Sequence, residues 1–313
     1  MIETRKAHEL DIVELTEDLP QYDLKRGARG AVVEVFDKPE EAYMLEFVDE
    51  SGTSSVIADW VKPSQINNVS AAKAAFEQGW RLFEQGKHSE AEKYFRKAVA
   101  LRPNEIKVLN NSLVNSLEVA DVENRWKTGI KVFSFALRID PAYETTRRNL
   151  AIAYFRRGIQ QGLAKNHEQA VHLFQQALLA DSSPELAEKV KKNLAVAYAA
   201  IAERFLTEGK LNEAAGMFEQ AQLAGCLTAA VFNDYAITLV RLGRFDDAIS
   251  AFERGLSHFS ADETLQENLV NAQGAAEELR RAGTKYEGVL PAEIEYDFPD
   301  FQIEREQEYL VAA

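Results

Sequence analysis

The chain has 313 residues, of which 46% are apolar and 27% charged, so wholesale disorder is excluded and about two domains are expected. The net charge of −14 lies at the two ends, because residues 67–282 carry as many bases as acids. Acidic ends argue against binding to nucleic acid or to an anionic membrane. The single cysteine excludes an internal disulfide, and no apolar run is long enough to insert into a membrane. We therefore expect a cytoplasmic protein.

Residues 10–66 alternate short runs of β-branched and aromatic residues with turn formers. The runs cover residues 11–15, 30–36, 42–48 and 56–59. Four or five short strands in so short a segment predict a small curled barrel. The stretch Gly27-Ala-Arg-Gly30 precedes a strand rather than a helix and lacks the Gly-Lys-Ser/Thr ending of a phosphate loop. We interpret it as a tight turn.

This segment resembles a small bacterial SH3-like barrel family of unknown function. The residues that carry the resemblance are Asp11, Val13, Leu15, Asp18-Leu-Pro20, Gly27, Gly30, Val32-Val33, Tyr43, Glu46-Phe47 and Gly52. The resemblance implies an SH3-like β-barrel for residues 1–66. Because members of that family occur beside toxin and immunity genes, it also leaves open an immunity or antitoxin role.

One helical motif recurs five times in the middle of the chain: a small residue, phenylalanine four positions later, and a second small residue three positions after that. The copies begin at Ala91, Gly129, Ala170, Ala214 and Ala248. Residues four apart share one face of a helix, so the small side chain lets a partner helix approach while the ring fills the groove beside it. The motif therefore predicts pairs of closely packed helices.

The motif and its spacing resemble the tetratricopeptide repeat (TPR), an antiparallel helix pair that stacks into a superhelix. We predict a mainly α fold, with a TPR α-solenoid of about five helix pairs over residues 67–283. The pairs lie near 72–105, 106–143, 144–184, 188–228 and 229–262, followed by a capping helix over 263–282. Helix-compatible insertions at 158–165 and 201–207 predict longer helices in repeats three and four.

Residues 284–313 lack the motif and interleave aromatic residues with acidic ones. Such a segment is unable to bury a core alone, so we predict an acidic tail whose aromatic side chains suit docking on another surface. A weakly ordered tail is the alternative.

No pattern of reactive residues indicates an enzyme. The five histidines form neither H-x-H nor H-E-x-x-H, and His167 and His172 are five apart, a poor spacing for metal ligands. Cys226 has no histidine nearby in sequence, and no pair of acids stands in a recognisable catalytic context. We expect no catalysis, no metal and no cofactor.

The resemblance implies that the first helix of each pair lines a concave groove. One slot of that helix holds an asparagine in four helices and Asp234 in a fifth. An amide offers a donor and an acceptor to a peptide backbone, and the row resembles the asparagine ladder of the O-linked N-acetylglucosamine transferase. Alternatively, these asparagines bond within the helix stack.

Basic residues stand beside this row, so we predict an acidic, extended ligand, with a merely solvated basic face as the alternative. The carboxylate clamp of the chaperone-binding TPR proteins is incomplete, because Asn110 and Val114 occupy slots that it fills with lysine and asparagine. The predicted groove residues are Asn111, Arg148, Asn149, Ile152, Arg156, Lys189, Lys192, Asn193 and Asn268.

Together these patterns predict a non-enzymatic scaffold or adaptor that binds a partner protein or an extended acidic peptide and is gated by its own tail. The alternatives are an immunity or antitoxin protein, an assembly chaperone for a specific client, and nucleic-acid binding through the barrel. The last is opposed by the acidity of residues 1–66. A homodimer, formed through the longer helices of repeats three and four, is left open.

Overall fold

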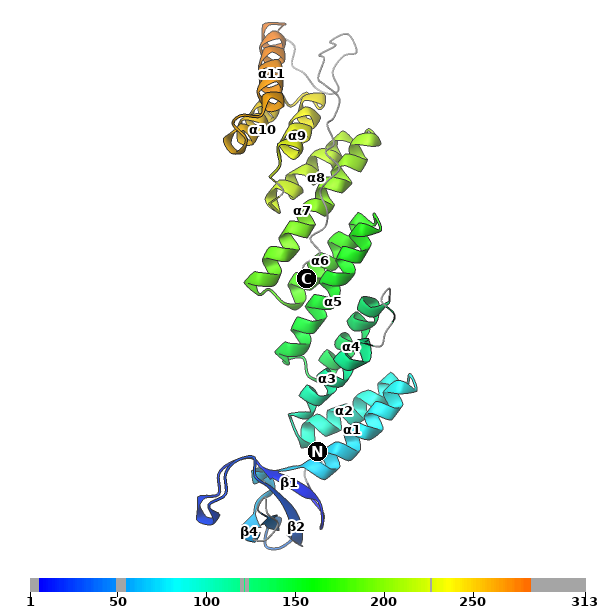
Figure 1. Cartoon of the computed structure of the whole chain (residues 1–313), viewed down its shortest axis with the longest axis vertical. Helices are drawn as coiled ribbons and strands as arrows, with labels where there is room; N and C mark the ends of the chain where they lie inside the picture. Colours follow the sequence, from blue (N-terminus) through cyan, green and yellow to red (C-terminus); the bar gives the residue numbers. More distant parts are fainter. Residues whose placement is uncertain (1–5, 49–54, 119–120, 122–123, 226, 283–313) are drawn as a thin grey trace. The chain divides into compact units, whose positions relative to one another are not determined.

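A computed structural model describes residues 6–48, 55–118, 121, 124–225 and 227–282. Within these ranges the chain forms five short strands followed by eleven α-helices, which confirms the predicted mainly α fold with an N-terminal β-domain (Figure 1). The chain divides into two compact units, residues 1–149 and 150–313. This division falls inside the predicted repeat domain of residues 67–283, whereas the predicted tail, 284–313, lies outside the described residues.

The first unit begins with an antiparallel five-stranded sheet of order β4-β3-β2-β1-β5. The strands are β1 (Ile12–Leu15), β2 (Arg29–Phe36), β3 (Ala42–Val48), β4 (Ser55–Val61) and β5 (Ile66–Asn68), with single turns η1 (Pro20–Tyr22) and η2 (Pro63–Gln65). The first four strands lie where the sequence predicts them. The fifth strand, which the sequence allowed without locating it, is the short β5, and it extends past residue 66.

Alternate residues of these strands form the core of the β-domain. Val13, Leu15, Val32, Tyr43 and Leu45 are almost completely buried, while their neighbours in sequence face outward, as a period of two requires. The tight turn predicted before β2 is confirmed.

The backbone requires glycine at two positions here, one in the turn and one in the strand that follows it. Gly27 has a φ of +87°, a conformation that side chains disfavour. A Cβ on Gly30 would lie 2.7 Å from the carbonyl oxygen of Glu46, so only glycine lets β2 approach β3 this closely.

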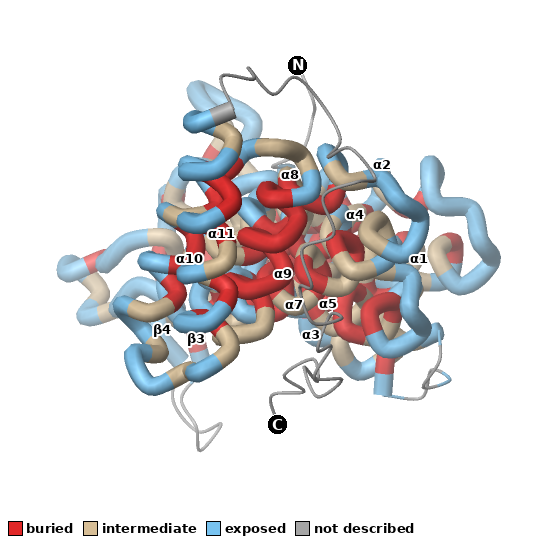
Figure 2. Tube along the Cα trace, turned by 90° about the horizontal axis from the view of Figure 1, so that it is seen from above, coloured by how far each residue is buried: buried red, intermediate tan, exposed pale blue. Residues whose placement is uncertain are grey.

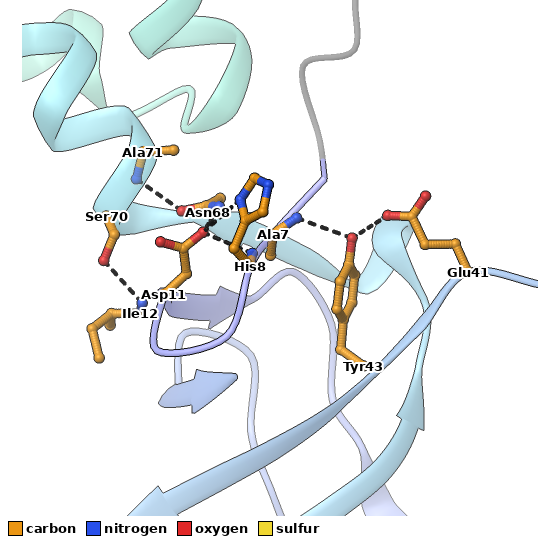
Figure 3. A network of polar contacts seen from close by, with 9 residues as sticks. All are labelled: Ala7, His8, Asp11, Ile12, Glu41, Tyr43, Asn68, Ser70 and Ala71. Carbon is orange, nitrogen blue, oxygen red and sulfur yellow. Dashed lines mark hydrogen bonds and ion pairs between the residues drawn. The ribbon is translucent and has the colours of Figure 1, made fainter. Parts of the chain in front are cut away.

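The sheet continues directly into the first helix, α1 (Val69–Glu84), and Figure 3 shows the contacts at this junction. The Asn68 side chain caps α1 by accepting a hydrogen bond from the Ala71 amide at 2.9 Å, and it donates to the Asp11 carboxylate at 2.7 Å. The Ile12 amide donates to the Ser70 hydroxyl at 2.9 Å. The Asp11 side chain, just before β1, and the Ile12 backbone thus hold the start of the solenoid.

The Tyr43 hydroxyl belongs to the same region of the β-domain (Figure 3). It donates to the Glu41 carboxylate and accepts a hydrogen bond from the Ala7 amide at 3.1 Å. Burial of the ring, followed by the bond to Glu41, raises the pKa of Tyr43 to about 12. The phenol therefore stays neutral at physiological pH.

A shielded ion-pair network joins the β-domain to the helices. The Arg102 guanidinium lies 3.0 Å from the Glu14 carboxylate of β1 and 3.2 Å from that of Glu105, and all three side chains are at most 17% exposed. The β-domain and the first helices are therefore held together by both backbone and side-chain contacts.

The helices of the first unit are α1, α2 (His88–Leu101), α3 (Glu105–Glu118), α4 (Arg125–Ile139) and the start of α5 (Glu144–Leu163). The predicted packing of small residue against ring is confirmed between α1 and α2. A Cβ on Gly79 would lie 3.1 Å from the Phe95 ring, and Phe95 itself is fully buried. Glycine at that position allows the two helices to approach closely.

The second unit contains the rest of α5 and six further helices. These are α6 (His167–Ala180), α7 (Pro184–Thr207), α8 (Leu211–Leu223), α9 (Ala229–Arg241), α10 (Phe245–His258) and α11 (Glu263–Ala282). At 20 and 24 residues, α5 and α7 confirm the predicted longer helices of repeats three and four. The capping helix also has its predicted bounds, with Leu265 buried and Arg280 exposed. Searched over the described residues, none of the helices has the length and hydropathy needed to cross a bilayer.

Candidate peptide-binding surface

In the first unit the predicted groove residues lie on α3 and α5. Asn111 and Arg148 are exposed, and Asn149 is half-buried. The Asn149 amide donates to the side-chain oxygen of buried Asn110 at 3.0 Å, and the Thr146 hydroxyl donates to the same oxygen at 3.0 Å. Asn149 therefore helps to tie α5 to α3, as the alternative interpretation of the asparagine row requires.

In the second unit four predicted groove residues lie on α5 and α7. Ile152 is exposed and Arg156 half-buried, one turn apart on α5, while Lys189 is half-buried and Lys192 exposed on α7. The two helices contribute to one hydrophobic cluster, to which α5 supplies Phe155 and Ile159 and α7 supplies Val190 and Leu194. An apolar side chain and three bases thus stand on two helices that pack together.

Acidic residues of α7 accompany its lysines. Lys189 lies 3.0 Å from Glu185, and Lys192 lies 3.2 Å from Glu188, each pair one helical turn apart. Exposed pairs of this kind contribute about 0.3–0.5 kcal/mol each, so an incoming carboxylate is able to displace them. The sequence prediction of a basic face is thereby qualified, because Glu185 and Glu188 stand among the three lysines of this part of α7.

The remaining two predicted asparagines are completely buried. Asn193 donates to the Lys189 carbonyl of its own helix at 2.9 Å, and Asn268 donates to the side-chain oxygen of Asn233 at 2.7 Å. The side-chain oxygens of both Asn193 and Asn268 are buried without a hydrogen-bond partner. With no exposed surface, both are shielded from a ligand in this conformation, so contact with a peptide needs the stack to open.

A buried polar cluster on α9 and α11 went unrecognised in the sequence. Asn233 receives the bond from Asn268 and lies 3.3 Å from the Asp234 carboxylate, and the Thr238 hydroxyl donates to the Asp234 carbonyl at 2.6 Å. All four residues are buried. The available signal was the adjacent pair Asn233–Asp234 inside an otherwise apolar run.

Burial dominates the electrostatics of this cluster. It raises the pKa of Asp234 to about 7, helped by repulsion from Glu203 and opposed by the bond from Asn233 and by the charge of Arg241. Burial also raises the pKa of Glu203 on α7. Figure 2 shows α9 buried along most of its length, and every residue from Val231 to Val240 is buried. A carboxyl so enclosed has no access to a substrate.

Searched over the described residues, no group of three or more histidine, cysteine, aspartate and glutamate side chains is placed to hold a metal ion.

Comparisons with protein families agree with the two-part organisation. Models of the tetratricopeptide repeat match residues 72–105 and 199–264. The model described as "Domain of unknown function (DUF4926)" matches residues 9–59. Residues 72–105 and 199–264 are thus similar to tetratricopeptide repeats and residues 9–59 to that domain, in agreement with the two resemblances. No curated protein matches it.

Solved structures of TPR proteins resemble the chain at low identity. The TPR protein TTC0263 of Thermus thermophilus is 17% identical, with a TM-score of 0.24, covering 65% of this chain and 99% of its own. The P58(IPK) TPR domain is 15% identical, with a TM-score of 0.29 and 68% of each chain covered. The TPR2AB domain of yeast Sti1, in complex with pHSP90, is 17% identical, with a TM-score of 0.24, covering 67% and 86%. Likenesses this distant carry no information about a ligand of this chain.

Tetratricopeptide repeats are in general a protein-interaction fold rather than a catalytic one, since stacked helix pairs create extended binding surfaces. The repeats found here support a protein–protein interaction scaffold.

Proposed function

We propose that this protein is a non-enzymatic, cytoplasmic adaptor that holds an extended acidic segment of a partner protein on α5 and α7. The observation that carries the proposal is the grouping of exposed Ile152 with Arg156, Lys189 and Lys192 on two packed helices. An apolar contact anchors a peptide, and bases around it select for carboxylates. No specific observation favours the immunity, chaperone or nucleic-acid alternatives.

The ion pairs of α7 define how such a peptide would bind. Each lysine exchanges a glutamate of its own helix for a carboxylate of the ligand, so the net electrostatic gain is small. Specificity then resides in the number of acids that the ligand places along the two helices, and binding weakens as salt rises.

The chain's own tail is the second part of the proposal. Residues 284–313 carry eight acids, two bases and several aromatic residues, the chemistry that this surface is proposed to accept. Because the tail is tethered, even weak docking competes at a high effective concentration. The tail would therefore gate access by outside partners.

The test is binding of a fluorescent synthetic peptide of residues 284–313 to the full chain and to a chain ending at Gly283. We expect the truncated chain to bind more tightly, because its own tail no longer competes. Equal affinities would contradict the gating. No binding by either chain at low salt would contradict the acidic-peptide proposal as a whole.

Matched variants locate the surface. In the truncated chain, Lys189→Glu with Lys192→Glu is expected to weaken binding about tenfold or more, because two attractions become repulsions. Lys191→Glu reverses one charge at an exposed position of the same helix and is the control. A variant with Glu185→Gln and Glu188→Gln, which frees both lysines, is expected to bind more tightly.

A further inference from the structure

The second helix of each pair carries an outward stripe of four positions, spaced four, three and four residues apart. In α6 the outward stripe consists of Glu168, His172, Gln175 and Leu179, and in α8 of Asn212, Gly216, Glu219 and Leu223. These spacings place all four positions on one face of a helix. Both helices pack on α7 within the second unit.

The last position of the outward stripe is unusual in these two helices. Leu179 is 79% exposed and Leu223 is 75% exposed. The same position holds Ala100 in α2, Arg138 in α4 and Ser257 in α10. Single exposed leucines are ordinary on protein surfaces, but here two occupy the equivalent position of consecutive repeats.

The rest of the outward stripe is also poor in charge in repeats three and four. Its one carboxylate in α6, that of Glu168, is paired with Arg204 of α7, and α8 contributes only Glu219. In the other repeats the outward stripe carries two or three charged residues, of which Arg96, Arg138 and Asp246 are also ion-paired. It contains Lys93 and Arg96 in α2, Lys127, Lys131 and Arg138 in α4, and Asp246 and Glu253 in α10. Low charge around exposed apolar residues is typical of the centre of a protein interface.

We propose that the outward stripes of α6 and α8 form an interface with a second copy of this chain. A two-fold dimer brings the same patch together on both subunits, which is stable only where the patch does not repel itself. Residues 67–282 have no net charge, whereas both ends of the chain are acidic, so this neutral, leucine-bearing stretch is where two copies approach with least repulsion. The peptide surface uses α5 and α7, so the dimer neither requires nor replaces it.

The test is the molar mass of the full-length protein in solution, measured by light scattering at low and high micromolar concentration. The wild type is expected to reach twice the 35.1 kDa of one chain at the higher concentration. The double variant Leu179→Glu with Leu223→Glu is expected to remain at the mass of one chain. Both leucines are exposed, so the variant keeps its helical circular dichroism.

The control is Ser257→Glu, which places the same charge at the same position of the outward stripe in α10, and it is expected to remain a dimer. A milder pair, Leu179→Ser with Leu223→Ser, is expected to weaken the dimer without adding charge. A wild type that stays at one chain's mass throughout would overturn the proposal. So would a double glutamate variant that dimerises as well as the wild type.

Discussion

At the scale of one residue, the main electrostatic feature of the second unit is the buried carboxyl of Asp234. It is 3% exposed, and its ordinary pKa of 3.8 is raised to about 7 by burial. An acid whose pKa is higher in the folded state binds protons on folding, so the folded state is most stable at low pH. The stability contributed by this proton is fully present below about pH 4 and is lost as the pH rises to about 7.

We therefore expect Asp234→Asn to stabilise the protein at about pH 8 by up to about 4 kcal/mol and to flatten its pH dependence between about pH 4 and 7. Asparagine keeps the acceptor for Asn233 and removes the buried charge. Urea denaturation at several pH values, followed by circular dichroism, measures the effect. Asp246→Asn, on the exposed surface of α10, is the control and is expected to keep the wild-type dependence. An unchanged pH slope in Asp234→Asn would show that this carboxyl is not the group responsible.

At the scale of secondary-structure elements, the main feature is the joint between the β-domain and the solenoid. β5 leads without a break into α1, and Arg102 lies between carboxylates of β1 and α3. The terminal repeat of a solenoid exposes an apolar end that has to be covered, and the β-domain lies against that end in the first unit. The joint is therefore held by several contacts besides the continuous backbone.

Replacing Arg102 by methionine is expected to cost about 2–3 kcal/mol, because the shielded Glu105 carboxylate loses this partner and Glu14 keeps only its pair with the more exposed Arg29. A double-mutant cycle with Glu14→Gln measures the coupling across the joint. Lys25→Met, which breaks the exposed pair with Asp18, is the control and is expected to change stability by less than about 0.5 kcal/mol. A coupling energy near zero would mean that the ion pair between Arg102 and Glu14 does not stabilise the joint.

Most elements were predictable because their signals are local. Periodicity placed the first four strands, and the bounds of α11 follow from its amphipathic pattern and the Gly283 after it. The short β5 was not located because Ile66-Asn-Asn68 has no alternation to detect; it forms only because β1 is beside it.

The candidate surface was less predictable than the elements. Asn111 and Asn193 occupy the same slot of their helices, yet one is exposed and the other completely buried. A position in the repeat specifies which face of the helix a side chain lies on. Its burial depends instead on which neighbouring helices cover that face. The sequence therefore found the polar row but was unable to separate ligand-facing members from those that bond inside the stack.

At the scale of the whole molecule, the division into two compact units predicts unfolding in more than one step. All three tryptophans, Trp60, Trp80 and Trp126, lie in the first unit, whereas helices of both units contribute to circular dichroism. In repeat proteins each element depends mainly on its neighbours, so distant parts are able to unfold separately.

In urea, tryptophan fluorescence and circular dichroism are therefore expected to give different midpoints. Asp234→Asn should move only the circular dichroism curve, and Arg102→Met should move the fluorescence curve. Coincident curves in the wild type and in both variants would show that the two units unfold as one.

The sequence alone determined the repeat motif, the number of helix pairs, the longer helices of repeats three and four and the acidic character of both ends. These features depend on residue types and spacings within one helix or strand. Such local patterns can be read from the sequence without knowledge of the tertiary contacts. Only the tertiary structure decided that Asn193 and Asn268 are buried, that Asp234 is enclosed and that Arg102 joins the β-domain to the helices. Each of these depends on segments that are distant in sequence and come into contact only in the folded protein. The contact determines how far a side chain is buried and which charges lie beside it.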